Sequence, residues 1–405
     1  MLSLDPAKLC AWQLDRDRER TKTYPGMFEH KLERMRASPL AFLRGAAPLY
    51  YELIATRPEL AKGPPGEGWI AGDLHLENFG AYRPHTHAAD DVDGAKRPAS
   101  EIAAFGMNDF DDAVIGPMWF DTLRLVTSLI LGGREVGADG PHTLDLCDTL
   151  LESYVAHLAG RAAMPPTPRP VANLIEVVLH RTRRELLDAR TETVRGSRRF
   201  IRGHRYKPLA RATQREAERA FGRYVERLDD DERASASHFE VLDMAFRVAG
   251  TGSLGGLRIA VLTRGKDGPD GAWVFDMKEE GRPSAARVLG SPKRKPAKRV
   301  ITALRACLAH PPRMLGATKL GERSMIVRRL SPQEDKLDLT HLHAPDLDPL
   351  ARYLGALAGA AHRRGATSLP KKPWTRDERS MLLDRAIVMA QIHEGAYLAM
   401  CKVAR

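Results

Sequence analysis

The sequence predicts an α+β protein in which a small strand-rich lobe is embedded in a larger helical one. Apolar residues recur at helical spacing near both ends of the chain, whereas short apolar runs with turn-rich separators occupy residues 239–330. The length of 405 residues also exceeds what one ordinary hydrophobic core accommodates. We therefore expect three segments: 1–238, mainly helical; 239–332, rich in strands; and 333–405, helical again.

The helical segments are predicted from apolar spacing and from the Pro and Gly residues that interrupt them. Residues 1–65 and 141–235 have a mainly helical character, the second being broken at 165–170. In the C-terminal segment, apolar residues follow an i, i+3, i+4, i+7 pattern at Leu354, Leu357, Ala358 and Ala361. This spacing gives a helix one apolar face.

The strands are predicted from short apolar runs with turn residues between them. Residues 257–262 and 273–277 flank the turn-rich segment 265–271, which indicates a β-hairpin. Residues 325–327 form another short candidate, and 102–107 form one that precedes a group of acidic residues. The strands of 239–330 should therefore make a compact sheet.

Composition narrows the class of protein. The formal net charge is +11, and no run approaches the ~18 apolar residues that a membrane helix requires. The four cysteines form no CxxC pair, so we expect neither a disulfide framework nor a structural zinc site. The start of the chain also lacks the apolar stretch of a secretory signal. These features predict a cytoplasmic protein that does not bind membranes.

The positive charge is concentrated in one segment. Residues 181–227 contain 15 Lys/Arg and six Asp/Glu. The interpretation we favour is a solvated helix face with ion pairs, and the alternative is a surface that binds polyanions. No nucleic-acid-binding motif accompanies the segment, so a nucleic-acid partner is not expected. An anionic acceptor could use it, which charge reversal at Arg198, Arg199 and Arg202 would test.

Two acidic motifs carry most of the chemical information. GDLHLENFG spans residues 72–80 and brings Asp73 and Asn78 into one short loop, while NDFDDAVIGPMWFD spans 108–121 and includes Asp109. Carboxylate and amide oxygens suit a hard cation such as Mg²⁺, and clustered carboxylates need a cation to neutralise them. Surface turns rich in Asp and Asn are the alternative explanation for either motif alone.

A glycine-rich run lies in the strand-rich segment. Gly250, Gly252 and Gly255 fit GxGxxG, and Ser253 lies within it. A turn of this kind lets backbone N–H groups approach phosphates closely. Strand-like residues follow the glycines, which disfavours a dinucleotide-binding fold. Lys278, after the strand 273–277, can reach the phosphates of a nucleotide or can be an exposed edge-strand lysine.

These motifs carry a resemblance to a known group of enzymes. GDLHLENFG resembles the HGDxHxxN loop of aminoglycoside phosphotransferases and other kinase-like proteins, with Ala71 where those enzymes usually have His. NDFDDAVIGPMWFD is similar to their metal-binding segment. The resemblance implies that Asp73 acts on the acceptor hydroxyl, that Asn78 and Asp109 bind Mg²⁺, and that Asp121 braces the loop of Asp73. It also implies that Gly250, Gly252, Ser253, Gly255 and Lys278 bind ATP.

The order of these motifs implies a circularly permuted, two-lobed, protein-kinase-like fold. The glycine-rich run follows the acidic motifs, and the helical run LGALAGAAHRRGA at 354–366 resembles the helix that ordinarily precedes the catalytic loop. The arrangement requires chain ends that lie close together. It resembles the bacterial family called domain of unknown function 2252, on residues that include Lys31, Met35, Phe42–Gly45, Met277–Glu279 and His362.

The function this implies is an ATP- and Mg²⁺-dependent phosphotransferase with a small-molecule or protein acceptor. Thr302 stands where kinases have the helix glutamate that pairs with the strand lysine, and Glu280 is better placed than Glu279 to substitute for it. A nucleotide-binding pseudokinase and an AMP-transferring enzyme are the alternatives. A metal hydrolase built on His85, His87, Asp90, Asp91 and Asp93 is the least favoured interpretation.

Overall fold

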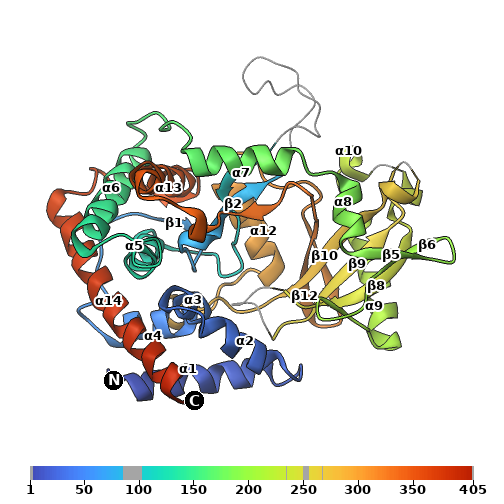
Figure 1. Cartoon of the computed structure of the whole chain (residues 1–405), viewed down its shortest axis with the longest axis horizontal. Coiled ribbons are helices and arrows are strands. Elements are labelled where there is room, and N and C mark those ends of the chain that lie inside the picture. The colour runs from blue at the N-terminus through green and yellow to red at the C-terminus, as the bar shows by residue number, and fades with distance from the viewer. Residues whose placement is uncertain (1–2, 85–102, 234, 250–254, 267, 404–405) are drawn as a thin grey trace.

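The protein combines helices and antiparallel sheets, which confirms the predicted α+β class (Figure 1). The computed structural model describes residues 3–84, 103–233, 235–249, 255–266 and 268–403. Helices gather at one side and a six-stranded sheet lies at the other (Figure 1). Within the described residues, no helix is long and apolar enough to cross a membrane.

Four helices begin the chain, and their starts follow from local sequence. Asp5 caps the first helix by accepting a hydrogen bond from Lys8 N at 2.9 Å, and Ser38 caps the third through Ala41 N at 3.1 Å. A proline follows each cap, where its missing N–H costs no hydrogen bond. The helices are α1 (Pro6–Thr21), α2 (Met27–Met35), α3 (Pro39–Gly45) and α4 (Ala47–Thr56).

The protein has two three-stranded sheets, and each pairs strands from distant parts of the chain. The strand orders are β14-β1-β4 and β13-β2-β3, and all pairings are antiparallel. Their members are β1 (Glu67–Ile70), β2 (Phe79–Tyr82), β3 (Ala104–Met107), β4 (Val114–Pro117), β13 (Asp335–Lys336) and β14 (Ala366–Ser368).

The larger sheet has six antiparallel strands in the order β11-β12-β10-β9-β8-β7. The predicted hairpin is confirmed by the pairing of β9 with β10, in which Val261 lies opposite Phe275. The strands are β7 (Tyr206–Lys207), β8 (Val241–Arg247), β9 (Arg258–Thr263), β10 (Trp273–Glu280), β11 (Gly316–Leu320) and β12 (Arg323–Arg329).

Alternation along β10 separates its apolar face from its polar one. Phe275 and Met277 join a hydrophobic cluster with Phe221 of α9 (Arg211–Val225), which covers that side of the sheet. Val274 belongs to a different hydrophobic cluster, on the other face of the sheet. Residues two apart on a strand share a face, so Val274, Asp276 and Lys278 all point away from α9. The sheet therefore presents Lys278 on the face opposite α9.

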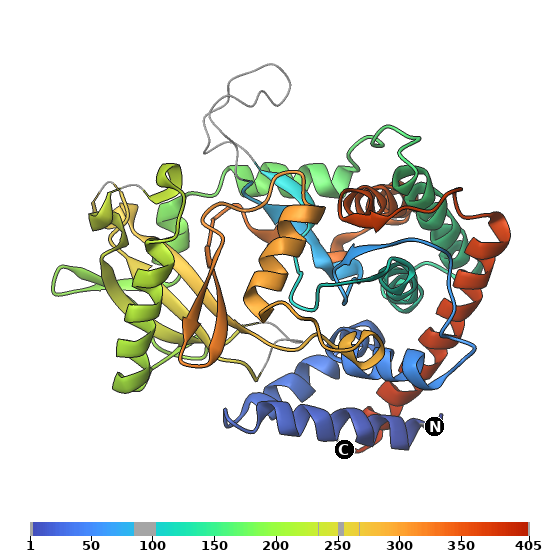
Figure 2. The same cartoon turned by 180° about the vertical axis from the view of Figure 1, so that it is seen from behind.

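Helices of the middle and the end of the chain surround the main hydrophobic core. The helix α13 packs along α6, and α14 packs against α1 and α5. The two chain ends lie beside each other at the lower edge of the molecule in both views (Figures 1 and 2). The helices that supply this core are α5 (Trp119–Gly133), α6 (Gly140–Leu158), α7 (Arg169–Leu179), α12 (Pro296–Cys307), α13 (Ala344–Arg364) and α14 (Arg376–Val403), and α11 (Ala286–Leu289) packs against α4. The short helices α8 (Arg183–Asp188) and α10 (Asp230–Arg233) lie on the side of the six-stranded sheet (Figure 1).

The basic segment 181–227 is only partly helical. Its middle forms the hairpin β5 (Thr191–Val194) and β6 (Ser197–Phe200), and β7 then joins the six-stranded sheet. Arg198 is paired with Asp188 at 3.1 Å and Asp270 at 2.7 Å, and Arg202 is paired with Asp243 at 2.8 Å. Ion pairs therefore already occupy two of the three arginines that we expected to be available to an anionic acceptor.

Candidate active site

The predicted residues of the acidic motifs meet Lys278 in one cleft of about 310 Å³. Asp73, Asn78, Asp109 and Lys278 all line it, although some 200 positions separate the lysine from Asp73 in the chain. Gly255, in contrast, lines a small neighbouring cavity with Lys278. Gly250, Gly252 and Ser253 lie outside the described residues, as do His85, His87, Asp90, Asp91 and Asp93.

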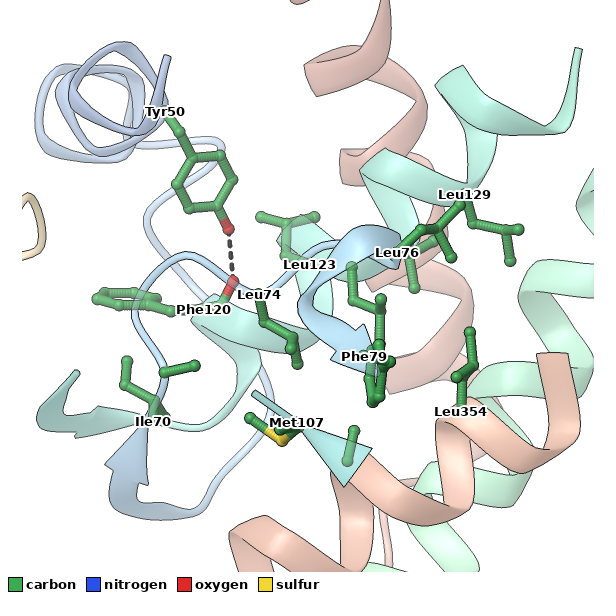
Figure 3. Packing of buried hydrophobic residues seen from close by; sticks show 14 of the residues in the cluster. Tyr50, Ile70, Leu74, Leu76, Phe79, Met107, Phe120, Leu123, Leu129 and Leu354 are labelled. Atoms are coloured by element: carbon green, nitrogen blue, oxygen red, sulfur yellow. Dashed lines mark hydrogen bonds between the residues drawn. The ribbon is translucent and has the colours of Figure 1, made fainter. Parts of the chain in front are cut away.

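The loop that carries Asp73 is held in place by its apolar neighbours. Leu74 and Leu76 are buried, and they lie among core residues such as Leu123 and Leu129 (Figure 3). The loop ends in a short 3₁₀ turn, Leu76–Asn78, which lets Asn78 Nδ2 donate to the backbone carbonyl of Asp73 at 2.7 Å. Burial of the two leucines thus fixes Asp73 and Asn78 on the cleft side of the loop.

Asp121 of α5 clamps the start of this loop. Its Oδ2 accepts a hydrogen bond from Ala71 N at 2.6 Å, and its Oδ1 accepts one from Gly72 N at 2.9 Å. The ring nitrogen Nε2 of His362, near the end of α13, lies 3.2 Å from Oδ2, and the His362 Nδ1 atom lies 2.8 Å from the hydroxyl of Tyr154. The carboxylate is fully buried, so these partners satisfy a charge that water cannot reach.

Asp73 is paired with a buried arginine that the sequence did not single out. Arg124 Nε donates to Asp73 Oδ1 at 2.6 Å, and the same guanidinium donates to the carbonyl of Leu43 at 2.8 Å. Burial, opposed by Arg124 and reinforced by Asp112 and Asp109, raises the pKa of Asp73 to about 7. A carboxylate with such a pKa is suited to exchange a proton near neutral pH.

The acidic neighbours of Lys278 are two carboxylates that also line the cleft. Its ammonium forms an ion pair with Asp111 Oδ2 and lies 3.7 Å from Glu280 Oε1. Glu280 is two positions along β10 and therefore on the same face, as expected for the better-placed glutamate. Burial, opposed by Lys278 and reinforced by Asp109, raises the pKa of Glu280 to about 7.

The helix α12 does not supply a partner for Lys278. Thr302 is turned away from the cleft, and its hydroxyl donates to the carbonyl of Lys298 at 2.7 Å on an exposed part of the helix. Arg299 of the same helix is buried instead and donates to the carbonyls of Asp111 at 2.8 Å, Gly281 at 3.1 Å and Ala113. It thereby ties the acidic loop to the end of β10.

The donor set fits a magnesium ion held partly by phosphate. Asn78 and Asp109 offer an amide and a carboxylate, while the described residues contain no group of three or more His, Cys, Asp or Glu side chains arranged to hold a metal. Mg²⁺ commonly takes one or two carboxylates and completes its shell with water and substrate phosphates. Asp109 also raises the pKa values of Asp73 and Glu280, so a cation beside it would relieve mutual repulsion.

A second cavity, of about 380 Å³, adjoins the first between the six-stranded sheet and α12. Asp109, Asp111 and Lys278 line both cavities, so they form the boundary between them. The remaining wall of the second cavity includes several aliphatic side chains: Val300, Leu304, Leu308, Leu315, Ile326 and Leu330. Charged side chains, among them Arg258, Asp276 and Arg328, complete the lining, so the second cavity combines an aliphatic patch with a polar wall.

Comparison with known proteins identifies a family. Residues 23–396 match the family model described as "Uncharacterized protein conserved in bacteria (DUF2252)". The chain belongs to this family. No curated protein and no solved structure matches it.

Two buried arginines hold the loops of the candidate site in this DUF2252 chain, and the sequence motifs indicated neither of them. Arg124 lies three positions after Asp121, so that α5 directs both toward the loop of Asp73, and this helical spacing was the only available signal. Arg299 gave no signal at all, because its partners are backbone carbonyls of segments far away in the chain. The roles predicted for Asp73, Asn78, Asp109, Gly255 and Lys278 stay predictions.

Proposed function

We propose that this DUF2252 protein is an ATP- and Mg²⁺-dependent phosphotransferase that acts on a hydroxyl-bearing acceptor. The observation that carries the proposal is the convergence of Lys278 with Asp73, Asn78 and Asp109 in one cleft. Enzymes that transfer phosphoryl groups depend on positioning and charge neutralisation more than on covalent chemistry. A lysine beside oxygen ligands for Mg²⁺ supplies both.

Each residue has a defined role in the proposed reaction. Asp73 orients the acceptor hydroxyl and takes its proton, as the acceptor oxygen bonds to the γ-phosphorus and the bond from that phosphorus to ADP breaks. Lys278 contacts the phosphates of the nucleotide. Asn78 and Asp109 would hold Mg²⁺, which when bound neutralises phosphate charge. The aliphatic patch of the second cavity, beside Lys278, would take the flat base of ATP.

The chain connectivity supports a circularly permuted kinase-like arrangement. The strand β14, just after α13, pairs with β1, just before the loop of Asp73, and Trp69 N donates to Gly365 O at 2.8 Å. The end of α13 thus lies beside the start of that loop although some 300 positions separate them. The adjacent chain ends meet the other requirement of a permutation (Figure 2).

The decisive experiment uses Asp73→Asn, with Asp145→Asn on an exposed part of α6 as the matched control. We expect ADP release from Mg–ATP to fall by about 10²-fold or more in Asp73→Asn, the range of a lost general base. Calorimetry should show Mg–ATP affinity retained within about threefold, and Asp109→Ala should weaken it. Failure of the wild-type protein to bind Mg–ATP would contradict the proposal.

A nucleotide-binding regulator without phosphotransfer is the second candidate. The observation that favours it is the ion pair of Asp73 with Arg124, together with a helix α12 that turns Thr302 away from Lys278. This candidate predicts Mg–ATP binding without ADP release. Transfer of AMP is separated from both by labelling, since only α-phosphate label would then appear on the acceptor.

A further inference from the structure

A third cavity, of about 500 Å³, lies beside the first two and has a strongly basic lining. We call it the basic cavity. It is formed where α2 meets the end of β8 and the segment 204–207, which includes β7. Its cationic lining residues are Arg34, Arg190, Arg205, Lys207 and Arg247, and two histidines, His30 and His204, accompany them.

The lining of the basic cavity carries more positive than negative charge. Among the described residues that line it, none is Asp or Glu. Asp276 forms an ion pair with Arg247 at 2.8 Å and also accepts three hydrogen bonds from Arg258, so one carboxylate serves two arginines. Glu33 lies 3.9 Å from His30, and its own side chain is 83% exposed. The cluster therefore attracts anions from solution.

Several nitrogens of this cluster are buried without a hydrogen-bond partner. Arg190 Nη1, Arg247 Nε and His30 Nε2 have none among the described residues. Buried polar groups are ordinarily hydrogen-bonded, so these unpaired nitrogens show that the cluster lacks enough internal acceptors. Burial and the neighbouring Arg34, with a smaller effect of Lys207, lower the pKa of His30, in keeping with a positive field.

We propose that the basic cavity binds a phosphate-bearing small molecule at a position separate from the nucleotide. Guanidinium groups match phosphate oxygens in charge and in the spacing of their donors. The cavity is concave and of the size that small ligands occupy. Arg34 lines both the basic cavity and the cleft of Asp73, so a bound anion lies next to the proposed site of transfer.

The experiment measures pyrophosphate binding to the full chain by calorimetry. Arg205→Glu/Lys207→Glu changes two exposed residues of the basic cavity, and Arg215→Glu/Arg219→Glu on α9 makes the same charge change elsewhere. We expect saturable binding to the wild-type protein, at least tenfold weaker binding to the first variant, and a change below twofold in the control. Equal weakening in both variants, or no saturable binding to the wild type, overturns the proposal.

A competition arm separates this site from the proposed nucleotide site; it rests on nucleotide binding but not on phosphotransfer. Pyrophosphate affinity should be retained when Mg²⁺ and a non-hydrolysable ATP analogue saturate the protein, and its loss would assign the anion to the nucleotide site and overturn the proposal. Glycerol 3-phosphate carries hydroxyl groups, whereas pyrophosphate does not. Comparing the two compounds distinguishes a phosphorylated acceptor from a phosphate effector, and either ligand would support the proposal. Faster ADP release with glycerol 3-phosphate alone indicates an acceptor, and an equal response to pyrophosphate indicates an effector.

Discussion

Arg124 holds Asp73 from inside the core: its Nε lies 2.6 Å from Asp73 Oδ1, and its side chain is fully buried whereas that of Asp73 is 21% exposed. The guanidinium also lies 4.9 Å from the ring centroid of Tyr50, which is itself tied to the carbonyl of Phe120 at 2.7 Å (Figure 3). The carboxylate is therefore positioned by a rigid core, and it faces the cleft with one buried cation behind it.

Removing that cation should destabilise the protein strongly. Arg124→Met leaves Asp73 without its partner, and breaking a buried pair costs about 3–5 kcal/mol of the free energy of unfolding. Arg124→Lys keeps the charge and should lose less. The control is Arg134→Met, because Arg134 follows α5 and makes an exposed ion pair with Glu394, which is worth about 0–1 kcal/mol. Urea unfolding of the three variants checks this order, and equal losses for Arg124→Met and Arg134→Met would contradict it.

A glycine at the start of the loop provides a second test. Gly72 has φ +79°, and a Cβ there would lie 2.1 Å from the carbonyl oxygen of Asp112. Gly137 has the same φ with nothing within 4 Å, so Gly137→Ala isolates the cost of the left-handed backbone. We expect about 1–2 kcal/mol for Gly137→Ala and a further 1–3 kcal/mol or more for Gly72→Ala. Chemical denaturation measures both variants. Indistinguishable midpoints would show that the loop of Gly72 can move away from Asp112 without a cost in stability.

The proposed nucleotide site gives a third prediction. Lys278→Met removes the cation that meets Asp111 and Glu280, and should weaken Mg–ATP binding at least tenfold, about 1.4 kcal/mol. Lys319→Met, on an exposed position of β11 in the same sheet, is the matched control and should leave the affinity unchanged. Calorimetric titration with a non-hydrolysable ATP analogue compares them. Unaltered affinity in Lys278→Met would remove this lysine from the nucleotide site.

Local sequence was sufficient to predict much of the fold. The hairpin of β9 and β10 followed from two apolar runs around a turn, and α13 followed from its apolar spacing. The segment 191–207 was harder, because TETVRGSRRF lacks apolar alternation and owes its hairpin to contacts made by Phe200 and Arg198 with distant residues. Pairing of β14 with β1 could not be inferred from either strand alone.

The candidate site was predictable only where its residues lie within motifs. Asp73, Asn78 and Asp109 belong to two short loops, so the residue types and their spacing were enough to indicate oxygen ligands. The partner of Lys278 was different: Asp111 reaches it from a loop that lies more than 160 positions earlier. Such a pairing depends on how the sheet docks onto the helices, which no local pattern encodes.

A buried histidine in the core should make stability depend on pH. Burial lowers the pKa of His393 in α14 to about 3, whereas the unfolded chain has a value near 6.5. The unfolded state therefore binds the proton more tightly, and stability is full above pH ~6.5 and falls as the pH drops toward 3. Between pH 7 and 5 this residue alone should cost about 2 kcal/mol of the free energy of unfolding. His393→Leu should remove that share of the slope, and His341→Leu, whose side chain is 83% exposed, should retain it. Urea unfolding from pH 7 to 5 measures all three proteins, and identical slopes for wild type and His393→Leu would exclude His393 as the titrating group.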